Sequence, residues 1–184
     1  MNERERTRLS KFLSLVLRHE PETIGLTLDV AGWVSVEMLL ARLAAYGKHT
    51  SREALDEIVA TSPKQRFSLS GDGLEIRANQ GHSVAVELGY VAVPPPAQLF
   101  HGTVAKALEA IEVQGLSKMR RHHVHLSADA ETAARVAKRR GRPIVLRIDS
   151  GRMSGAGFVF FRSENGVWLT HAVPQEFLEV LGDI

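Results

Sequence analysis

A triplet of prolines, Pro94-Pro95-Pro96, constrains the fold more than any other feature of this 184-residue sequence. Proline has a fixed φ and no backbone N–H, so a run of three belongs neither inside a helix nor in a central strand. The triplet ends a stretch, residues 81–96, in which the residue composition of the sequence changes. We therefore expect two domains of roughly 90 residues, 1–80 and 97–184, joined by a linker at 81–96.

The first domain shows the pattern of three helices followed by a β-hairpin. The first helix is predicted by apolar residues at helical spacing, namely Leu9, Phe12, Leu13, Val16 and Leu17. Pro21 ends this helix. Further helices are expected at residues 36–45 and after Ser51. The alternating runs RFSLS and LEIRA, joined by Gly-Asp-Gly, predict the hairpin. This order is typical of a winged-helix module, a fold that usually binds nucleic acid but in many proteins makes only protein contacts.

The second domain is expected to be α+β with a mostly antiparallel sheet. Short strands are predicted at residues 99–100, 124–126, 144–148, 158–161 and 167–169, and helices at 104–113 and 129–140.

Composition excludes several classes of protein. The chain is 44% hydrophobic and 24% charged, which argues against general disorder. With no cysteine, it has no disulfide, iron–sulfur cluster, thiolate zinc site or cysteine nucleophile. No stretch of about 20 apolar residues and no signal-type N-terminus is present, so we expect a cytoplasmic protein without a membrane partner. P-loop, Rossmann and zincin motifs are absent as well.

Positive charge is concentrated in one segment, although the formal net charge is only +2. Residues 118–142 contain eight basic residues against two acidic ones. Such an excess indicates a phosphate-bearing partner, and a solvated helix face is the alternative interpretation.

Three histidines, His122, His123 and His125, precede or enter a predicted strand. Because side chains alternate along a strand, His123 and His125 should share one face, opposite the apolar Val124 and Leu126. The imidazoles could form a zinc site, a ligand pocket or simply a polar face. We expect no metal, since a closed zinc site needs about four ligands and the neighbouring residues are arginines.

Other candidate residues have both functional and structural interpretations. Arg18-His19 ends the first helix, where cations also interact favourably with the helix dipole. Arg66 and Ser68 should lie opposite Phe67 and Leu69, facing either solvent or an anion. His101-Gly102-Thr103 falls where a strand passes into a helix. Backbone N–H groups there could bind a pyrophosphate, or Thr103 could simply cap the helix.

Five motifs then occur in order along the chain: LSLVLRHEP, KQRFSLS, IRANQGHS, LFHGT and GLSKMRRHHVHLS. Together they resemble the RNA 2′-phosphotransferase family over nearly the whole chain. The later run FVFFRSENGVWLTHAVP resembles the family's closing strands, with Val167 where many ADP-ribosyltransferases carry a glutamate.

The resemblance implies an N-terminal winged-helix lobe that binds RNA and a C-terminal ADP-ribosyltransferase-like lobe that binds NAD. It implies that an internal RNA 2′-phosphate, as at a tRNA splice junction, first attacks NAD and releases nicotinamide. The resulting 2′-phospho-ADP-ribosylated RNA then yields 2′-hydroxyl RNA and ADP-ribose 1″,2″-cyclic phosphate. NAD is thus a co-substrate, and we expect the enzyme to act as a monomer.

The resemblance also assigns residues to roles. Its catalytic quartet falls on Arg18, His19, Arg66 and Arg121. Its NAD pocket falls on His101, Gly102, Thr103, either His123 or His125, Ser127, and Val167. RNA contacts are expected from Lys64, Arg77, Arg139 and Arg140, for which a solvated surface remains the alternative.

Two other functions are compatible with the sequence. The first is an ADP-ribosyltransferase that stops after the first step and caps terminal phosphates of RNA or DNA. The second is a winged-helix regulator that binds nucleic acid without catalysis. Consumption of NAD separates the enzymes from the regulator, and the fate of the phosphate separates the two enzymes.

Overall fold

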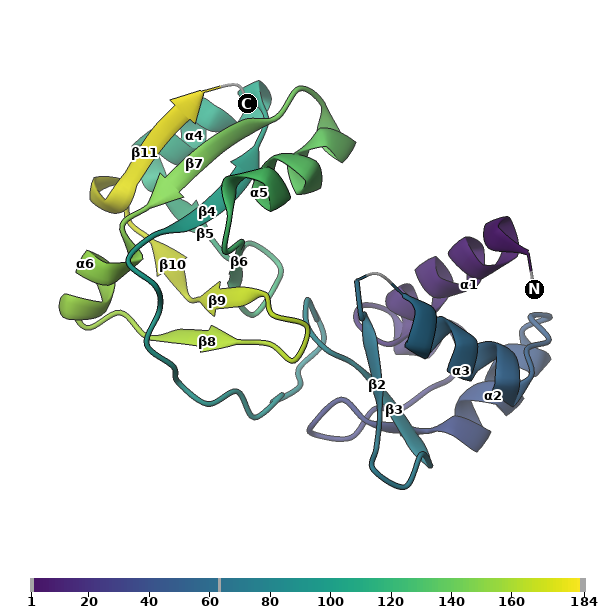
Figure 1. Cartoon of the computed structure of the whole chain (residues 1–184). Helices are drawn as coiled ribbons and strands as arrows, with labels where there is room; N and C mark the ends of the chain where they lie inside the picture. Colours follow the sequence, from purple (N-terminus) through teal and green to yellow (C-terminus); the bar gives the residue numbers. More distant parts are fainter. Residues whose placement is uncertain (1, 63, 183–184) are drawn as a thin grey trace. The chain divides into compact units, whose positions relative to one another are not determined.

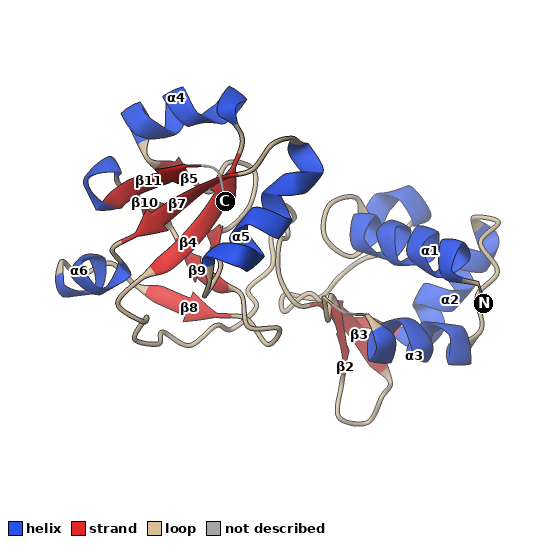
Figure 2. Cartoon of the chain, turned by 45° about the horizontal axis from the view of Figure 1, so that its top comes forward, coloured by secondary structure: helices blue, strands red, loops and turns tan. Residues whose placement is uncertain are grey.

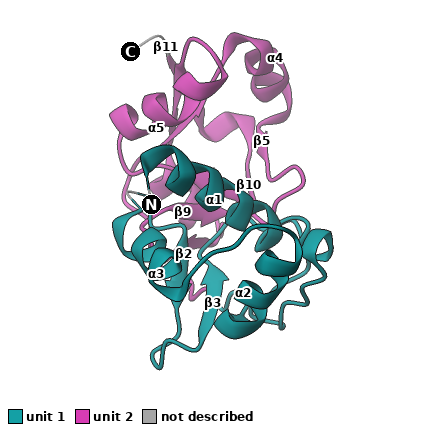
Figure 3. Cartoon of the chain, turned by 90° about the vertical axis from the view of Figure 1, so that its right-hand side faces the viewer, with its two compact units in different colours: residues 1–89 teal, residues 90–184 magenta. Residues whose placement is uncertain are grey.

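Helices dominate the first half of the chain and short strands the second, as the α+β prediction requires (Figure 1). The structure, a computed structural model, describes residues 2–62 and 64–182. It divides into two units, Met1–Gly89 and Tyr90–Ile184, called unit 1 and unit 2 below (Figure 3).

Unit 1 contains the three predicted helices and the predicted hairpin. Its elements are α1 (Glu3–Val16), the 3-10 helix η1 (Pro21–Ile24), β1 (Val34–Ser35), α2 (Val36–Ala45), α3 (Arg52–Thr61), β2 (Phe67–Leu69) and β3 (Glu75–Ala78). The strands form an antiparallel sheet in the order β1-β3-β2. The two-stranded wing expected from the sequence therefore has a third strand, β1. The sequence did not predict β1, because two residues are too few to show the alternation of apolar and polar side chains.

The helices of unit 1 begin where the sequence supplies capping residues. Asn2 and Glu5 form a reciprocal capping box on α1, while Ser35 and Ser51 accept hydrogen bonds from the first turns of α2 and α3. The predicted stripe of α1 faces inward, with Leu13, Val16 and Leu17 fully buried. The sheet and all three helices thus share one apolar core.

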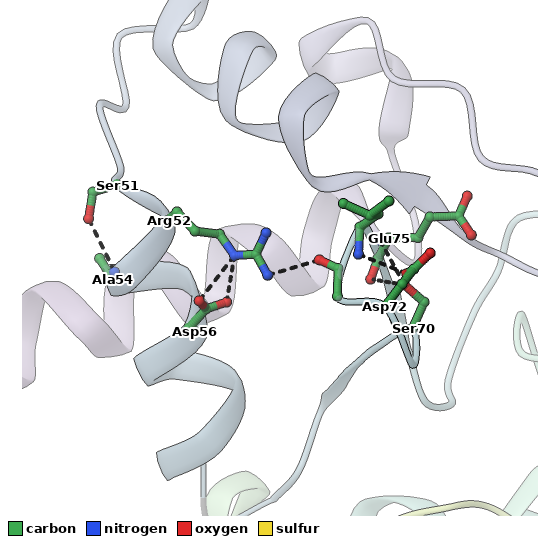
Figure 4. Close-up of polar contacts among 9 residues, drawn as sticks. Ser51, Arg52, Ala54, Asp56, Ser70, Asp72 and Glu75 are labelled. Atoms are coloured by element: carbon green, nitrogen blue, oxygen red, sulfur yellow. Dashed lines mark hydrogen bonds and ion pairs between the residues drawn. The ribbon is translucent and has the colours of Figure 1, made fainter.

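A polar network fixes the turn between β2 and β3 (Figure 4). The Arg52 guanidinium donates to the Asp56 carboxylate at 2.8 Å and to the carbonyl of Gly73 at 2.8 Å, which ties α3 to the turn. Asp72 accepts from the Ser70 hydroxyl at 2.6 Å and from the backbone N–H of Leu74 at 3.0 Å. Gly73 has a φ of +72°, a conformation that favours glycine.

The stretch expected to be a linker is divided between the units. Residues 81–89 belong to unit 1, where His82 and Val86 are buried and the N–H of Ser83 donates to the carbonyl of Arg18 at 2.8 Å. Residues 90–96 belong to unit 2, where Val93 N–H donates to the Phe160 carbonyl at 2.9 Å. Unlike an open linker, both parts are hydrogen-bonded to the unit they belong to.

Unit 2 contains small antiparallel sheets with helices at their edges and faces (Figure 2). Its elements are β4 (Leu99–Thr103), α4 (Ala105–Gln114), β5 (Leu116–Ser117), β6 (Val124–Leu126), α5 (Ala130–Ala137), η2 (Lys138–Arg140), β7 (Ile144–Ile148), α6 (Ser150–Gly155), β8 (Phe160–Arg162), β9 (Trp168–Thr170), β10 (Ala172–Val173), η3 (Gln175–Phe177) and β11 (Leu178–Gly182). The sheets are β11-β7-β4, β6-β9-β8 and β10-β5.

Two of these sheets meet at one residue pair. Phe100 of β4 and Ser127, just after β6, exchange backbone hydrogen bonds of 2.9 and 2.7 Å. Helix α5 follows directly and packs on β4. Residues from β4, β6 and the end of α5 are thereby brought together.

The five strands and two helices predicted for this half are confirmed within a few residues, whereas β5, β10, β11 and α6 were not predicted. In the described part of the chain, no helix is both long and apolar enough to cross a membrane.

Candidate active site

Two of the predicted catalytic arginines of unit 1 are in direct contact. Arg18 follows α1, and its guanidinium Nη2 donates to the backbone carbonyl of Arg66 at 3.1 Å. Its charge also lies 5.9 Å from the centre of the Phe67 ring. The end of α1 and the start of β2 are therefore joined through Arg18.

His19 is held beside this pair by a different segment. Its Nδ1 lies 2.9 Å from the hydroxyl of Ser83, whose backbone N–H donates to the carbonyl of Arg18. The side chain of His19 is otherwise exposed. An oriented, solvent-accessible imidazole is suited to proton transfer.

The loop before Arg66 has a strained backbone that Asn79 holds. Gln65 has a φ of +38°, and among non-glycine residues in the described ranges only Met119 also has a positive φ. Asn79, which is buried, donates from Nδ2 to the Gln65 carbonyl at 2.8 Å and from its N–H to the Arg66 carbonyl at 3.0 Å. Strain of this kind persists where surrounding contacts impose it, frequently at functional sites.

The guanidinium of Arg66 is itself oriented from α1. Its Nη1 donates to the hydroxyl of Ser10, a buried residue, at 3.3 Å. Of the predicted RNA contacts in this unit, Lys64 is exposed and Arg77 stacks over the Trp33 ring at 4.5 Å. Unit 1 thus carries three predicted catalytic residues and two further cations.

In unit 2, His101 and His125 come together across β4 and β6. The ring Nδ1 of His101 lies 3.0 Å from the backbone carbonyl of His125, to which it donates. Burial lowers the pKa of His101, the bond to this carbonyl raises it, and the nearby charges of Arg140 and Arg121 lower it further. At neutral pH His101 is therefore neutral, and its Nε2 is a hydrogen-bond acceptor.

Arg121 contacts the ring of His125. Its Nη1 lies 2.7 Å from His125 Nδ1, and because arginine only donates, this nitrogen accepts and the neutral ring carries its proton on Nε2. Burial of the guanidinium lowers the pKa of Arg121, and the charge of Arg140 does so as well. Arg121 and Arg140 are thus two neighbouring cations, an arrangement that favours binding of an anion.

His123 lies apart from this group. Its ring contacts Tyr90, Phe161 and His171, with the centre of the His171 ring 5.1 Å away. Burial, followed by the charges of His171, His122 and Lys118, lowers its pKa to about 4. Of the two histidines between which the sequence left the choice open, His125 is the one that joins His101 and Arg121.

The structure corrects the interpretation that Thr103 caps a helix, and it gives Gly102 a packing role. Both lie within β4, Thr103 is buried, and the N-cap residue of α4 is Val104. A Cβ on Gly102 would lie 2.0 Å from the carbonyl oxygen of Ala133. The missing side chain of Gly102 makes room for α5.

The last predicted pocket residues lie near the same place. Ser127 directly follows β6 and Val167 directly precedes β9, next to the paired residues Leu126 and Trp168. The N–H of Val167 donates to the Ser163 hydroxyl at 3.0 Å.

Arg139 is exposed, as are the other basic residues of α5 and its end: Arg135, Lys138, Arg140 and Arg142.

Within the described ranges, no group of three or more histidine, aspartate or glutamate side chains is placed to hold a metal ion. The predicted site residues are oriented by other side chains that were not predicted from the sequence. Ser10 and Asn79 position Arg66, and Ser83 positions His19. Asn79 and Ser83 belong to the IRANQGHS motif, which is the signal that could have identified them.

Comparisons with known proteins show which family the chain resembles. A family model described as RNA 2′-phosphotransferase, Tpt1 / KptA family, matches residues 4–172. A Streptomyces griseus protein is 54% identical over 189 residues, covering 99% of this chain and all of the relative. A Pseudomonas syringae protein is 49% identical over 184 residues, covering 100% and 98%. An Agrobacterium fabrum protein is 52% identical over 177 residues, covering 96% and 95%.

Each of these relatives bears the name "Probable RNA 2'-phosphotransferase". The matched residues extend over both units. On this evidence the chain belongs to the RNA 2′-phosphotransferase, Tpt1 / KptA family.

Proposed function

We propose that this protein is an RNA 2′-phosphotransferase that uses NAD as co-substrate. The observation that carries the proposal is the near full-length match to relatives of that name. The helices and the β2–β3 hairpin of unit 1 support a winged-helix lobe that binds RNA. The small antiparallel sheets of unit 2 support an ADP-ribosyltransferase-like lobe that binds NAD.

The chemistry of His101 fits a ribose. Its buried, neutral ring donates through Nδ1 to the His125 carbonyl, which leaves Nε2 to accept from a sugar hydroxyl. His125, Ser127 and Val167 surround the same end of β6 and β9. We assign the NAD ribose to this place, with the backbone of Gly102 and Thr103 beside it.

In the first step, an oxygen of the RNA 2′-phosphate attacks the ribose C1″, and the C1″–nicotinamide bond breaks. The phosphate is already an anionic nucleophile, so this step needs no general base, which is compatible with Val167 in place of a glutamate. The phosphate must instead be held and aimed. Arg18, Arg66 and Arg121 serve this purpose, because arginine presents several donors in a planar fork.

In the second step, the ribose O2″ attacks phosphorus and the bond from phosphorus to the RNA 2′-oxygen breaks. The proton on O2″ must leave and the RNA oxygen must gain one, and His19 is the titratable member of the quartet that transfers it. Negative charge grows on the other phosphate oxygens, where Arg66 and Arg121 stabilise it. The products are 2′-hydroxyl RNA and ADP-ribose 1″,2″-cyclic phosphate.

RNA carrying the phosphate would also contact cations outside the quartet. Lys64 and Arg77 in unit 1 and Arg139 and Arg140 in unit 2 are assigned to its phosphates. Each contact of this type releases counterions, so affinity should fall as salt rises.

The test is to incubate the full-length protein with an oligoribonucleotide carrying one internal 2′-phosphate, with and without NAD. We expect 2′-hydroxyl RNA, nicotinamide and the cyclic phosphate product only with NAD, in the presence or absence of a chelator. Turnover without NAD, or its loss on chelation, would refute the mechanism. ADP-ribosylated RNA as the final product, on terminal phosphates alone, would assign the chain to the capping reaction instead.

A further inference from the structure

Four rings in unit 2 form a cluster that the reaction described above does not use: Tyr90, His123, Phe161 and His171, called the ring cluster below. His123 is at its centre, with ring centres 5.8 Å from Tyr90, 5.3 Å from Phe161 and 5.1 Å from His171. Phe161 also contacts Tyr90 at 6.4 Å and His171 at 5.9 Å.

The ring cluster lies on the same face of the β6-β9-β8 sheet as His125. His125, Leu169 and Phe161 are paired directly across the three strands, and residues paired in this way point to one face. His123 lies just before β6, two residues from His125, and its ring contacts Phe161 of this face. The opposite face carries Val124, Leu126 and Phe160, which are buried in the core of unit 2.

The rings of the cluster are accessible. His171 is exposed, and Tyr90, His123 and Phe161 are each partly exposed. His123, with a pKa of about 4, is uncharged at neutral pH. The exposed surface of these rings is suited to a flat partner.

We propose that the ring cluster stacks a base of the RNA substrate, from a nucleotide next to the one whose phosphate Arg121 holds. The inference rests on the proposed function, which supplies an RNA with a phosphate at Arg121. It adds a contact to the base itself, where the arginines contact only phosphates.

The placement of charge favours an RNA base as the occupant. Arg121 and Arg140 provide the cations that attract the backbone, and the ring cluster lies on the sheet face that carries His125. Single-stranded nucleic acids are bound in this way, by cations that follow the backbone and rings on which bases stack. Every base has a flat face, so the contact should tolerate any sequence.

The experiment measures equilibrium binding of a fluorescent single-stranded oligoribonucleotide with one internal 2′-phosphate, in the absence of NAD. Matched oligonucleotides lack the base on the 5′ side of the phosphorylated nucleotide, on the 3′ side, or at that nucleotide. The protein variants are Phe161→Leu, which keeps apolar volume but removes the ring, and His171→Ala, which removes an exposed imidazole ring. His49→Ala removes an exposed imidazole of unit 1 outside the site and is the matched control.

We expect each ring variant to bind the complete oligonucleotide about 5- to 150-fold more weakly, the range for loss of one stacked base. With one of the two oligonucleotides that lack a neighbouring base, the same variants should bind as tightly as the wild type does, because the stacking partner is already gone. With the oligonucleotide that is abasic at the phosphorylated nucleotide, the variants should still bind more weakly than the wild type. His49→Ala should match the wild type throughout. The slope of affinity against salt should not change in the ring variants, since stacking releases no counterions.

Equal losses on complete and abasic oligonucleotides would refute base stacking. So would unchanged RNA affinity with a raised KM for NAD, which would assign the rings to the co-substrate. A wild-type protein that binds but does not convert the complete oligonucleotide with NAD would count against the proposed function. If the wild type converts the complete oligonucleotide, and neither the ring variants nor the abasic oligonucleotides change this conversion, the result counts only against the stacking contact.

Discussion

The carbonyl of Arg66 accepts two hydrogen bonds, from the Arg18 guanidinium at 3.1 Å and from the Asn79 N–H at 3.0 Å. Arg18 follows a helix, Arg66 precedes β2, and Asn79 follows β3. The two arginines are therefore held by one backbone atom. Any change that shifts this carbonyl should affect both.

Asn79→Ala tests this dependence. The substitution removes the donor from Asn79 Nδ2 to the carbonyl of Gln65, which holds the strained turn before Arg66. Loss of one buried hydrogen bond should lower the free energy of unfolding by about 1–3 kcal/mol. Turnover of 2′-phosphorylated RNA should fall at least about tenfold, equivalent to about 1.4 kcal/mol in the barrier.

Urea unfolding and steady-state kinetics at saturating NAD measure the two effects. Ser70→Ala, which removes a hydroxyl from the far turn of the same hairpin, is the control and should leave turnover near that of the wild type. If Asn79→Ala lowers stability but not turnover, Asn79 has no part in positioning Arg66.

Local signals in the sequence predicted much of the fold. Helix α2 spans 36–45 as expected, because Ser35 caps it and its apolar residues keep helical spacing. The β2–β3 hairpin was identified from alternation and Gly-Asp-Gly, which form the turn that Arg52 and Asp72 stabilise. These elements are defined by residues close together in the chain, and such residues are visible in a sequence.

Features that depend on distant residues were not predictable in this way. β5 and β10 are two-residue strands that exist because Leu116 and Ser117 pair with Val173 and Ala172. The packing role of Gly102 could not be predicted, because the carbonyl that fills its Cβ position belongs to α5. Ser10 lies on a helix 56 residues before Arg66, and no local pattern predicts their contact.

Gly102→Ala should destabilise unit 2. The added Cβ would lie 2.0 Å from the Ala133 carbonyl oxygen and 2.7 Å from its carbon, so α5 must move away from β4. Overpacking of this kind reduces stability by about 1–3 kcal/mol or more. Affinity for NAD should fall as well, because His101 is the preceding residue of β4.

Thermal unfolding and NAD titration measure these effects. Gly155→Ala is the matched control, since nothing lies within 4 Å of the position of its Cβ. Equal behaviour of the two variants would mean that α5 moves without consequence for the His101 site.

The stability of the protein should depend on pH through His123. Its pKa is about 4 in the folded chain and 6.5 ordinarily, so between these values the unfolded chain binds more protons. The contribution to stability is therefore complete above about pH 6.5 and is lost as the pH falls towards 4. Because the ring is partly exposed and solvent screens it, we expect about 1 kcal/mol less stability at pH 5 from this residue.

His123→Phe keeps a ring at this position but removes the titration. Urea unfolding of the variant and the wild type at pH 7.5 and pH 5 isolates the contribution of His123. The wild type should lose more stability than the variant between these two values. An equal loss in both would show that His123 does not titrate differently on folding.

The last prediction separates the two chemical steps. In the first step several cations share the holding of the phosphate, whereas in the second step charge grows on its oxygens and a proton moves. Only interactions that are stronger in the transition state than in the ground state accelerate a step. Arg66→Ala, which removes one charged donor, should slow the second step by about 10²–10³-fold.

The Arg66→Ala enzyme should therefore release nicotinamide and accumulate 2′-phospho-ADP-ribosylated RNA, which is heavier and migrates more slowly in a gel than the substrate. His19→Ala should accumulate less of it, because water can replace the imidazole in part of the proton transfer. Gel analysis of the RNA and quantification of nicotinamide over one time course measure both variants. If neither variant consumes NAD, Arg66 and His19 act in phosphate binding or in the first step. The roles assigned to these residues would then be wrong while membership of the family still held.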